Sequence, residues 1–466
     1  CTESHALTAC PMERTELSFL KLLPFLSFLV GPRLPAATAA HLPPEAHPTN
    51  SGYLTVNPTT GSALFYAFYE AQNPTSPLPH TPLLLWLQGG PGCSSMLGNF
   101  FELGPWRASP RRDGVRDVTI DPNPGAWNRI AGLLFVDSPI GTGFSVAASG
   151  EEIPRDQKSV ASHLFVAIRQ FLALDPSFKR RPIYFTGESY AGKYVPAFGY
   201  YTVKWNARLP SSERLNLQGV AIGNGLTDPA VQVTTHAANA YFSGLINEKQ
   251  RSELEAAQLA AVRLSRRGKW SAATDARKSV LGLLQNLTGL ATLYDLRRVE
   301  PYPTWVVGKL LQSPEVKAAL GVNRSMEWEE CSAAVGRALQ EDVMKSARFM
   351  VEAVVREVKV LVYQGQCDLR DGVVSTEAWV KEIRWEGIGE FMAAERRVWT
   401  VEGKLAGYVQ VGGNLSHAVV LRAGHFMPFD QPQNSQAMIE AWVLDKGLFT
   451  VHQPGILPNI KGSLVL

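Results

Sequence analysis

The sequence predicts an α/β fold, in which helices flank a mostly parallel central sheet. Two observations lead to this prediction. Short runs of consecutive apolar residues recur along the 466-residue chain, and such runs are typical of strands that are buried on both faces of a sheet. Apolar residues at helical spacing lie between several of these runs, and alternating strands and helices are typical of a doubly wound parallel sheet.

The predicted sheet begins with a hairpin, in which two β-rich runs at residues 52–56 and 63–69 are separated by a turn. Two strands buried on both faces follow, at residues 82–87 and 132–137. The first of these two strands ends in the glycine loop 88–95. A glycine loop in this place exposes backbone N–H groups at the end of a strand.

The next stretch of the chain centres on one serine. After a predicted helix at residues 158–174, a short apolar strand runs into Gly187-Glu188-Ser189-Tyr190-Ala191 and then into a second helix. This pattern predicts a nucleophile elbow with Ser189 at its tip, because small neighbours let the strand and the helix pack closely around a strained turn. Alanine replaces the usual last glycine, and the pattern also occurs by chance. The prediction of a nucleophile elbow therefore needs support from other residues of the chain.

Two further strands, at residues 217–225 and 358–363, enclose a long segment without strand signals. We interpret residues 227–355 as an inserted helical cap over the C-terminal edge of the sheet, where open α/β sheets place their active sites. A separate helical domain is the alternative, but neither flank resembles a flexible linker. Within this segment we expect a helix with Leu254 and Ala261 on its apolar face, a helix from Ser313 to Gly321, and a third at residues 335–354.

The C-terminal part is expected to complete the sheet with a hairpin of strands at residues 407–411 and 415–421. The loop 422–428 leads to a last amphipathic helix at residues 434–446. The predicted organisation is therefore a core of residues 40–226 and 356–449, the cap, and a tail of residues 450–466.

The N-terminal residues are interpreted as a leader. Residues 1–11 are doubtful, because the chain starts with Cys1 and the first methionine is Met12. An apolar run followed by small residues predicts a secretory signal peptide over residues 12–39. Lys21 and Pro24 interrupt the apolar run, so a short membrane anchor or a fortuitous apolar tract remains an alternative. No other stretch is long and apolar enough to span a bilayer, and no membrane association of the mature chain is expected.

Charge and cysteine spacing exclude several kinds of site. The formal net charge is only +3 and the basic residues form no aromatic-rich stripe, so we expect no nucleic-acid binding. The cysteines lack zinc-ligand spacing, so we expect no metal. Without the leader, Cys93, Cys331 and Cys367 would form one disulfide and leave one free thiol, but spacing does not choose the pair. Three sequons agree with secretion and glycosylation: Asn286, Asn323 and Asn414.

A nucleophilic serine needs a histidine as base and a carboxylate that orients the base. In sheets with a nucleophile elbow, the acid and the histidine follow the serine in that order. His425 lies in a loop just past a strand end and is the expected base, whereas His417 lies within a strand and His452 in the tail. Asp368 follows the strand at residues 358–363 and is the expected acid, with Asp371 as its competitor.

The serine chemistry also needs two backbone donors for a developing oxyanion. The expected donors are the N–H groups of Tyr190, directly after the serine, and of Gly90 in the glycine loop. The alternative interpretation of residues 88–92 is a phosphate cradle, which the missing GK[ST] ending disfavours.

Taken together, these segments resemble the serine carboxypeptidases of the α/β-hydrolase clan, over about residues 51–446. The resemblance is closest to the plant serine carboxypeptidase-like proteins. The matching stretches are 86–95 (WLQGGPGCSS), 100–105 (FFELGP), 136–145 (VDSPIGTGFS), 187–196 (GESYAGKYVP), 220–228 (VAIGNGLTD), 365–368 (GQCD) and 423–428 (AGHFMP).

The resemblance implies an α/β-hydrolase fold with an inserted helical cap, and an enzyme that releases C-terminal residues from peptides without a cofactor. It also implies that Cys93 pairs with Cys331, which leaves Cys367 free. Family members bind the terminal carboxylate with a tryptophan, an amide and two glutamic acids. By resemblance, these residues are Trp86, Gln88, Glu102 and Glu188.

Two features of this carboxylate site shape the expected activity. Gln88 stands where most carboxypeptidases of the family carry asparagine. Two close carboxyl groups raise each other's proton affinity, so we expect hydrolysis to be faster in acid than at neutral pH.

Two other functions compete with hydrolysis. Acyltransferases of the family, which use sugar esters as acyl donors, resemble the chain over most of its length. They commonly carry aspartate before the nucleophile, so Glu188 favours hydrolysis. A non-catalytic binding or protective partner is the third possibility, which the complete triad disfavours. The expected location is the exterior or the vacuole.

Overall fold

The computed structural model describes residues 41–111 and 117–450. The predicted signal peptide at residues 12–39, the doubtful residues 1–11, His452 and the tail beyond residue 450 lie outside the described residues. No helix in the described ranges is both long and apolar enough to cross a bilayer.

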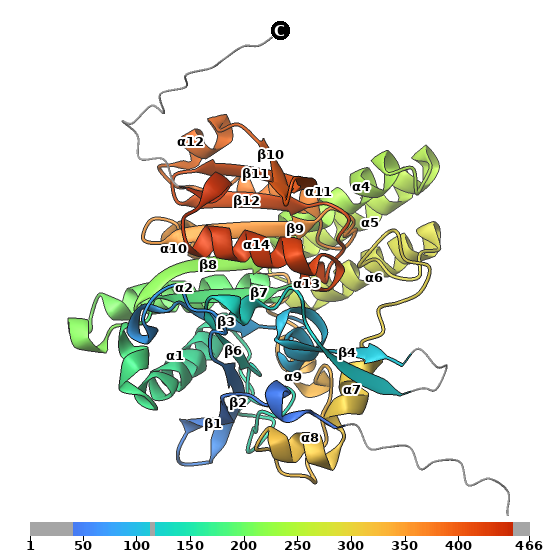
Figure 1. Cartoon of the computed structure of the whole chain (residues 1–466). Coiled ribbons are helices and arrows are strands. Elements are labelled where there is room, and N and C mark those ends of the chain that lie inside the picture. The colour runs from blue at the N-terminus through green and yellow to red at the C-terminus, as the bar shows by residue number, and fades with distance from the viewer. Residues whose placement is uncertain (1–40, 112–116, 451–466) are drawn as a thin grey trace, which may run out of the picture. The chain divides into compact units, whose positions relative to one another are not determined.

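The core is a ten-stranded sheet with the order β1-β2-β6-β3-β7-β8-β9-β12-β11-β10 (Figure 1). Neighbouring strands from β6 to β12 in this order pair in parallel, and antiparallel strands extend the sheet at both edges. The predicted fold class is therefore confirmed. The strands are β1 (Asn50–Asn57), β2 (Ser62–Tyr69), β3 (Leu83–Leu87), β6 (Gly132–Val136), β7 (Ile183–Glu188), β8 (Leu217–Gly223), β9 (Lys359–Gly365), β10 (Arg397–Val401), β11 (Lys404–Gly412) and β12 (Leu415–Val420).

The consecutive apolar residues of β3 explain why this strand lies at the centre. Leu84 and Trp86 join one hydrophobic core, whereas Leu83, Leu85 and Leu87 join the core on the opposite face. Because side chains alternate between the faces of a strand, only an unbroken apolar run satisfies both cores.

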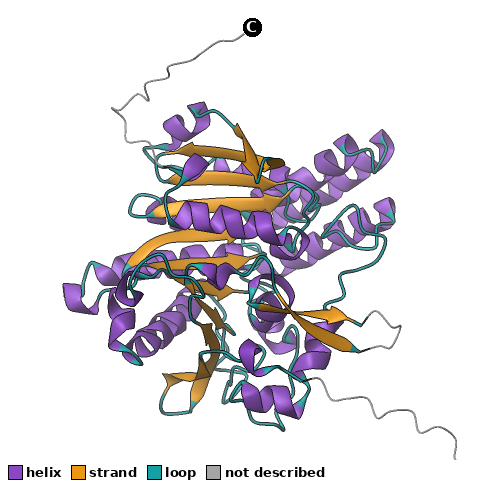
Figure 2. Cartoon of the chain, viewed as in Figure 1, coloured by secondary structure: helices purple, strands orange, loops and turns teal. Residues whose placement is uncertain are grey.

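Helices cover both faces of the sheet (Figure 2). Helices α1 (Gln157–Ala173) and α2 (Ala191–Asn206) pack in one core, and α14 (Pro432–Val443) packs in the other. Helix α1 begins after Asp156, whose side chain accepts a hydrogen bond from the Ser159 N–H and caps the helix.

Only helical elements lie between β8 and β9 in the described chain. Helices α5 and α6 pack against each other, and together with α4 they contribute to a separate small hydrophobic core. The helices are α3 (Pro229–Gln232), α4 (His236–Phe242), α5 (Glu248–Arg266), α6 (Trp270–Thr288), α7 (Trp305–Leu311), α8 (Pro314–Ala319), α9 (Ala333–Ala338) and α10 (Arg348–Val354), with one 3₁₀ turn at Val233–Thr235.

The prediction of one helix at residues 335–354 is wrong, because α9 ends at Ala338 and α10 begins at Arg348. The intervening chain is turned inward by a buried lysine. Lys193 Nζ donates to the carbonyl oxygen of Asp342 and lies 3.0 Å from its carboxylate. A long-range ion pair therefore overrides the local helical pattern.

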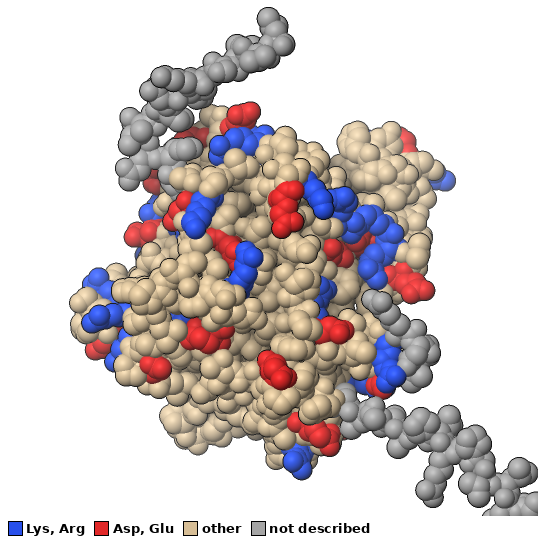
Figure 3. All heavy atoms as spheres, viewed as in Figure 1, with Lys and Arg blue, Asp and Glu red and all other residues tan. Residues whose placement is uncertain are grey.

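Other elements were not predicted. They include the helices α3, α4, α6 and α7 between β8 and β9, the edge strand β10, the helices α11 (Val373–Val380) and α12 (Ile388–Ala393), the short helix α13 (Met427–Asp430), and a small hairpin of β4 (Trp106–Pro110) and β5 (Val118–Pro122). On the face shown in Figure 3, acidic and basic side chains are interspersed.

Candidate active site

Ser189 lies at the turn between β7 and α2, with a backbone φ of 63°. This left-handed conformation is strained for a residue with a side chain. The turn is held by hydrogen bonds from Ser189 N to Gly223 O and to Ser189 O from the N–H groups of Gly192 and Leu226. A Cβ on Gly187 would lie 2.8 Å from that of Ala191, which explains the small residues around the serine.

His425 and Asp368 face each other, with 2.7 Å between His425 Nδ1 and Asp368 Oδ2. Both side chains are buried. Asp368 Oδ2 also accepts a hydrogen bond from Asn224 Nδ2, and its Oδ1 accepts from the N–H groups of Arg370 and Asp371. These donors fix the carboxylate, and the carboxylate in turn fixes the orientation of the histidine ring.

The competing acid, Asp371, points elsewhere. Its carboxylate lies 3.3 Å from Arg277 Nη2 and 3.6 Å from Arg370 Nε. Of the two predicted candidates, only Asp368 contacts His425 in the described structure.

The ring of His425 stacks on Tyr294, with 4.3 Å between ring centroids and 7° between planes. Its Nε2 is buried and has no hydrogen-bond partner in the described ranges. No hydrogen bond joins this nitrogen to Ser189 in the described structure, and catalytic hydrogen bonds are often loose before substrate binds.

The glycine loop after β3 lies against the serine turn. A Cβ on Gly89 would be 2.5 Å from Tyr190 N, so only glycine permits this approach. The N–H groups of Gly90 and Tyr190 donate no hydrogen bond to the described residues. Two unpaired N–H groups beside a nucleophile are suited to stabilise an oxyanion.

The four residues of the predicted carboxylate site come together, and three of them form a hydrogen-bonded chain. Trp86 Nε1 donates to Gln88 Oε1 over 2.9 Å, and Gln88 Nε2 donates to Glu188 Oε1 over 3.1 Å. Gln88 therefore bridges the tryptophan and the glutamate. The fourth residue, Glu102, lies on a π-helical turn at Gly98–Leu103 and is fully buried.

Glu102 and Glu188 interact with each other directly. Burial raises the pKa of Glu102 to about 7, although a hydrogen bond with Glu188 lowers it. Burial also raises the pKa of Glu188 well above its usual value, and the charge of Glu102 adds to this. Among hydrogen bonds of ordinary geometry, both oxygens of Glu102 and Oε2 of Glu188 have no partner in the described structure. The pair thus tends to hold a proton that can be donated to an anion.

A disulfide between Cys93 and Cys331 joins the glycine loop to the segment before α9. Two backbone hydrogen bonds accompany it, from Ser94 N to Glu330 O and from Ser332 N to Gly92 O. Cys367 is free and buried. The disulfide pairing implied by the resemblance is therefore confirmed.

The sequons differ in their surroundings. Asn286 and Asn323 are exposed, whereas Asn414 is half-buried and its Nδ2 donates to Val355 O. Within the described ranges, no group of three or more His, Cys, Asp or Glu side chains is arranged to hold a metal ion.

Sequence reasoning did not single out Asn224 or Tyr294. Asn224 follows β8, and the predicted acid follows β9, so knowledge that these strands are neighbours would have pointed to it. Tyr294 lies between α6 and α7, and no local pattern marks its contact with His425.

Comparisons with known proteins agree with this geometry. The family model described as serine carboxypeptidase matches residues 41–445. Serine carboxypeptidase-like 50 of Arabidopsis thaliana is 59% identical over 408 residues, covering 87% of this chain and 90% of that protein. The probable serine carboxypeptidase CPVL of Homo sapiens is 33% identical, covering 85% and 83%. The crystal structure of Kex1(delta)p, a prohormone-processing carboxypeptidase from Saccharomyces cerevisiae, matches with a TM-score of 0.77 at 25% identity, covering 87% and 93%.

Proposed function

Because the chain belongs to the serine carboxypeptidase family, we propose that it releases the C-terminal residue of peptides through an acyl-enzyme on Ser189. The observation that carries this proposal is the chain from Trp86 through Gln88 to Glu188. This series of hydrogen bonds ends at Glu188, one residue before the nucleophile. A terminal carboxylate bound there would therefore place the last peptide bond beside Ser189.

In the proposed reaction, His425 Nε2 takes the proton of the Ser189 hydroxyl as the oxygen attacks the carbonyl carbon. The N–H groups of Gly90 and Tyr190 stabilise the oxyanion. The carbon–nitrogen bond then breaks, and the histidine returns its proton to the leaving amine. Water, activated by the same histidine, hydrolyses the ester and restores the serine.

Glu102 and Glu188 give the proposed activity a pH dependence. At acidic pH the pair holds a proton and can donate a hydrogen bond to the substrate carboxylate. As the pH rises through about 7, the pKa of Glu102, the pair gains negative charge, which repels the substrate carboxylate. For a blocked dipeptide we expect KM to rise by about tenfold or more between pH 5 and pH 8, the equivalent of one lost charge-assisted hydrogen bond.

The double variant Glu102→Gln/Glu188→Gln tests this origin of the pH dependence. Glutamine keeps an acceptor for Gln88 and a donor for the substrate at every pH. We therefore expect the KM of this variant to change less with pH than that of the wild type. Equal or better turnover by the wild type above neutrality would contradict the proposed carboxylate site.

Acyl transfer from a sugar ester is the alternative for the same nucleophile. One experiment separates the two reactions: the protein is incubated with a blocked dipeptide and, in parallel, with an acyl-glucose and an acceptor. We expect release of the free C-terminal amino acid in the first and little transfer in the second. Transfer without peptide hydrolysis would overturn the proposal.

We also propose that the protein is located in the secretory pathway, with the exterior or the vacuole as destination. The Cys93–Cys331 disulfide supports this, because disulfides persist in oxidising compartments. The exposed Asn286 and Asn323 are the sequons best placed to carry glycans.

A further inference from the structure

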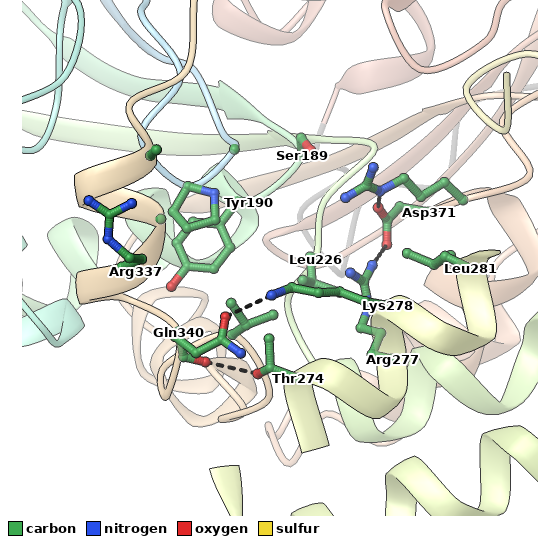
Figure 4. A pocket seen from close by; sticks show the side chains of 16 residues that line it. Ser189, Tyr190, Leu226, Thr274, Arg277, Lys278, Leu281, Arg337, Gln340 and Asp371 are labelled. Carbon is green, nitrogen blue, oxygen red and sulfur yellow. Dashed lines mark hydrogen bonds and ion pairs between the residues drawn. The ribbon is translucent and has the colours of Figure 1, made fainter. Parts of the chain in front are cut away.

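A cavity of about 370 Å³ opens beside Ser189 (Figure 4). Its walls come from the serine turn, the glycine loop, the helices α6 and α9, and the loop after β9. Five charged residues line it, of which four are basic and one is acidic: Arg277, Lys278, Arg337, Arg370 and Asp371.

Two of the arginines share one carboxylate. Arg277 and Arg370 both contact Asp371, and the side chains of Arg277 and Asp371 are only 5% and 2% exposed. The three groups together therefore carry one net positive charge at the cavity wall, and Asp368 is the other carboxylate that acts on Arg370. Nε of each arginine is buried without a hydrogen-bond partner in the described structure. Buried donors of this kind are costly unless a ligand supplies an acceptor.

The rim adds further positive charge. Lys278 Nζ donates to Gln340 Oε1 and lies 3.4 Å from Asp275 Oδ1. The negative charge of Asp275 therefore compensates the charge of this lysine. Arg337 is exposed on α9 and forms no ion pair in the described part of the chain. Even with Asp275 and Asp368 included, four positive groups stand against three negative ones.

The position of the cavity indicates which part of a substrate it receives. Gly90 and Tyr190, the expected oxyanion donors, line it together with Ser189. None of the four residues of the carboxylate site does so. The cavity therefore lies on the acyl side of the scissile bond, opposite the leaving residue.

We propose that this cavity binds an acidic side chain of the residue before the scissile bond, so that peptides with glutamate or aspartate in the penultimate position are preferred substrates. This inference rests on the proposed carboxypeptidase activity. It adds a substrate preference to that activity, with Arg277 and Arg370 in the wall and Lys278 and Arg337 at the rim as the residues that determine it.

The test compares three blocked dipeptides that share one C-terminal residue and carry Glu, Gln or Lys before it. At pH 5.5 the glutamate is ionised, since its usual pKa is about 4.3. We expect kcat/KM for Glu to exceed that for Gln by about tenfold, the equivalent of one hydrogen bond to a charged group. Lys should be the poorest of the three, and added salt should reduce the differences.

Variants assign the preference to the cavity. Arg337→Gln and Lys278→Gln should each lower the Glu-to-Gln ratio about threefold, as expected for partly exposed charges. Arg263→Gln on the exposed side of α5 is the matched control and should leave the ratio unchanged. Because each ratio is measured within one variant, a change in folding or active fraction cancels.

The outcomes separate this inference from the proposed function. Hydrolysis of all three dipeptides at equal rates would overturn the inference and leave the carboxypeptidase activity standing. No hydrolysis of any dipeptide would instead overturn the proposed function. A preference that is unchanged in the Lys278→Gln/Arg337→Gln double variant would also contradict the assignment to this cavity.

Discussion

Replacing either Ser189 or His425 with alanine should lower kcat for C-terminal hydrolysis by about 10⁶-fold. Replacing both should cost no more than replacing one, because the two residues act as a unit. In the proposed reaction the serine supplies the attacking oxygen, and the histidine, which contacts Asp368 through Nδ1, removes its proton. The measurement is steady-state hydrolysis of a blocked dipeptide by the wild type, the two single variants and the double variant.

The control for this comparison is thermal stability. Ser189 is half-buried and the substitution removes a single oxygen atom, so Ser189→Ala should melt close to the wild-type temperature. Multiplicative losses in the double variant, or a single variant that retains more than a hundredth of the activity, would show that the residues do not form one catalytic unit.

Loss of the Cys93–Cys331 disulfide should have the largest effect on stability. The bond closes a loop with a sequence separation of 238 residues. By the loop-entropy relation, removing it with Cys93→Ala/Cys331→Ala should lower the free energy of unfolding by about 5 kcal/mol. The glycine loop that carries Gly90 would also lose its link to the cap segment, so kcat should fall even where the variant is folded.

Urea-induced unfolding of the double variant measures this effect. Cys367→Ala is the matched control, because Cys367 is buried but free and its loss removes only a small side chain. We expect the control to be destabilised by about 1 kcal/mol. Similar destabilisation of both variants would mean that the disulfide contributes little to the folded state.

The strands of the core could be predicted from sequence because their signals are local. An unbroken apolar run such as that of β3 has no other stable placement than between two hydrophobic cores. The serine turn was equally local, since Gly187 and Ala191 are small for steric reasons that the structure makes explicit.

What could not be predicted depends on contacts between distant segments. The helix expected at residues 335–354 is broken because Lys193, far away in sequence, draws Asp342 inward. Asn224 is a second example of a long-range contact, because its side chain donates a hydrogen bond to Asp368 from the end of the neighbouring strand. Local periodicity contains no information about such partners.

The carboxylate site shows how resemblance and geometry complement each other. The resemblance named Trp86, Gln88, Glu102 and Glu188, but it left open whether the longer Gln88 could serve. In the structure the amide of Gln88 spans from Trp86 to Glu188. No sequence pattern predicted the cationic cavity, because its arginines come from separate elements of the fold.

Covalent labelling of Ser189 tests the central claim most directly. The folded protein is treated with a fluorophosphonate, and the labelled residue is identified by peptide mass spectrometry. The proposed function predicts one adduct on Ser189, none in Ser189→Ala, and slower labelling in His425→Ala. A well-folded wild-type sample without an adduct, or with an adduct on another residue, would contradict the assignment of Ser189 as the nucleophile.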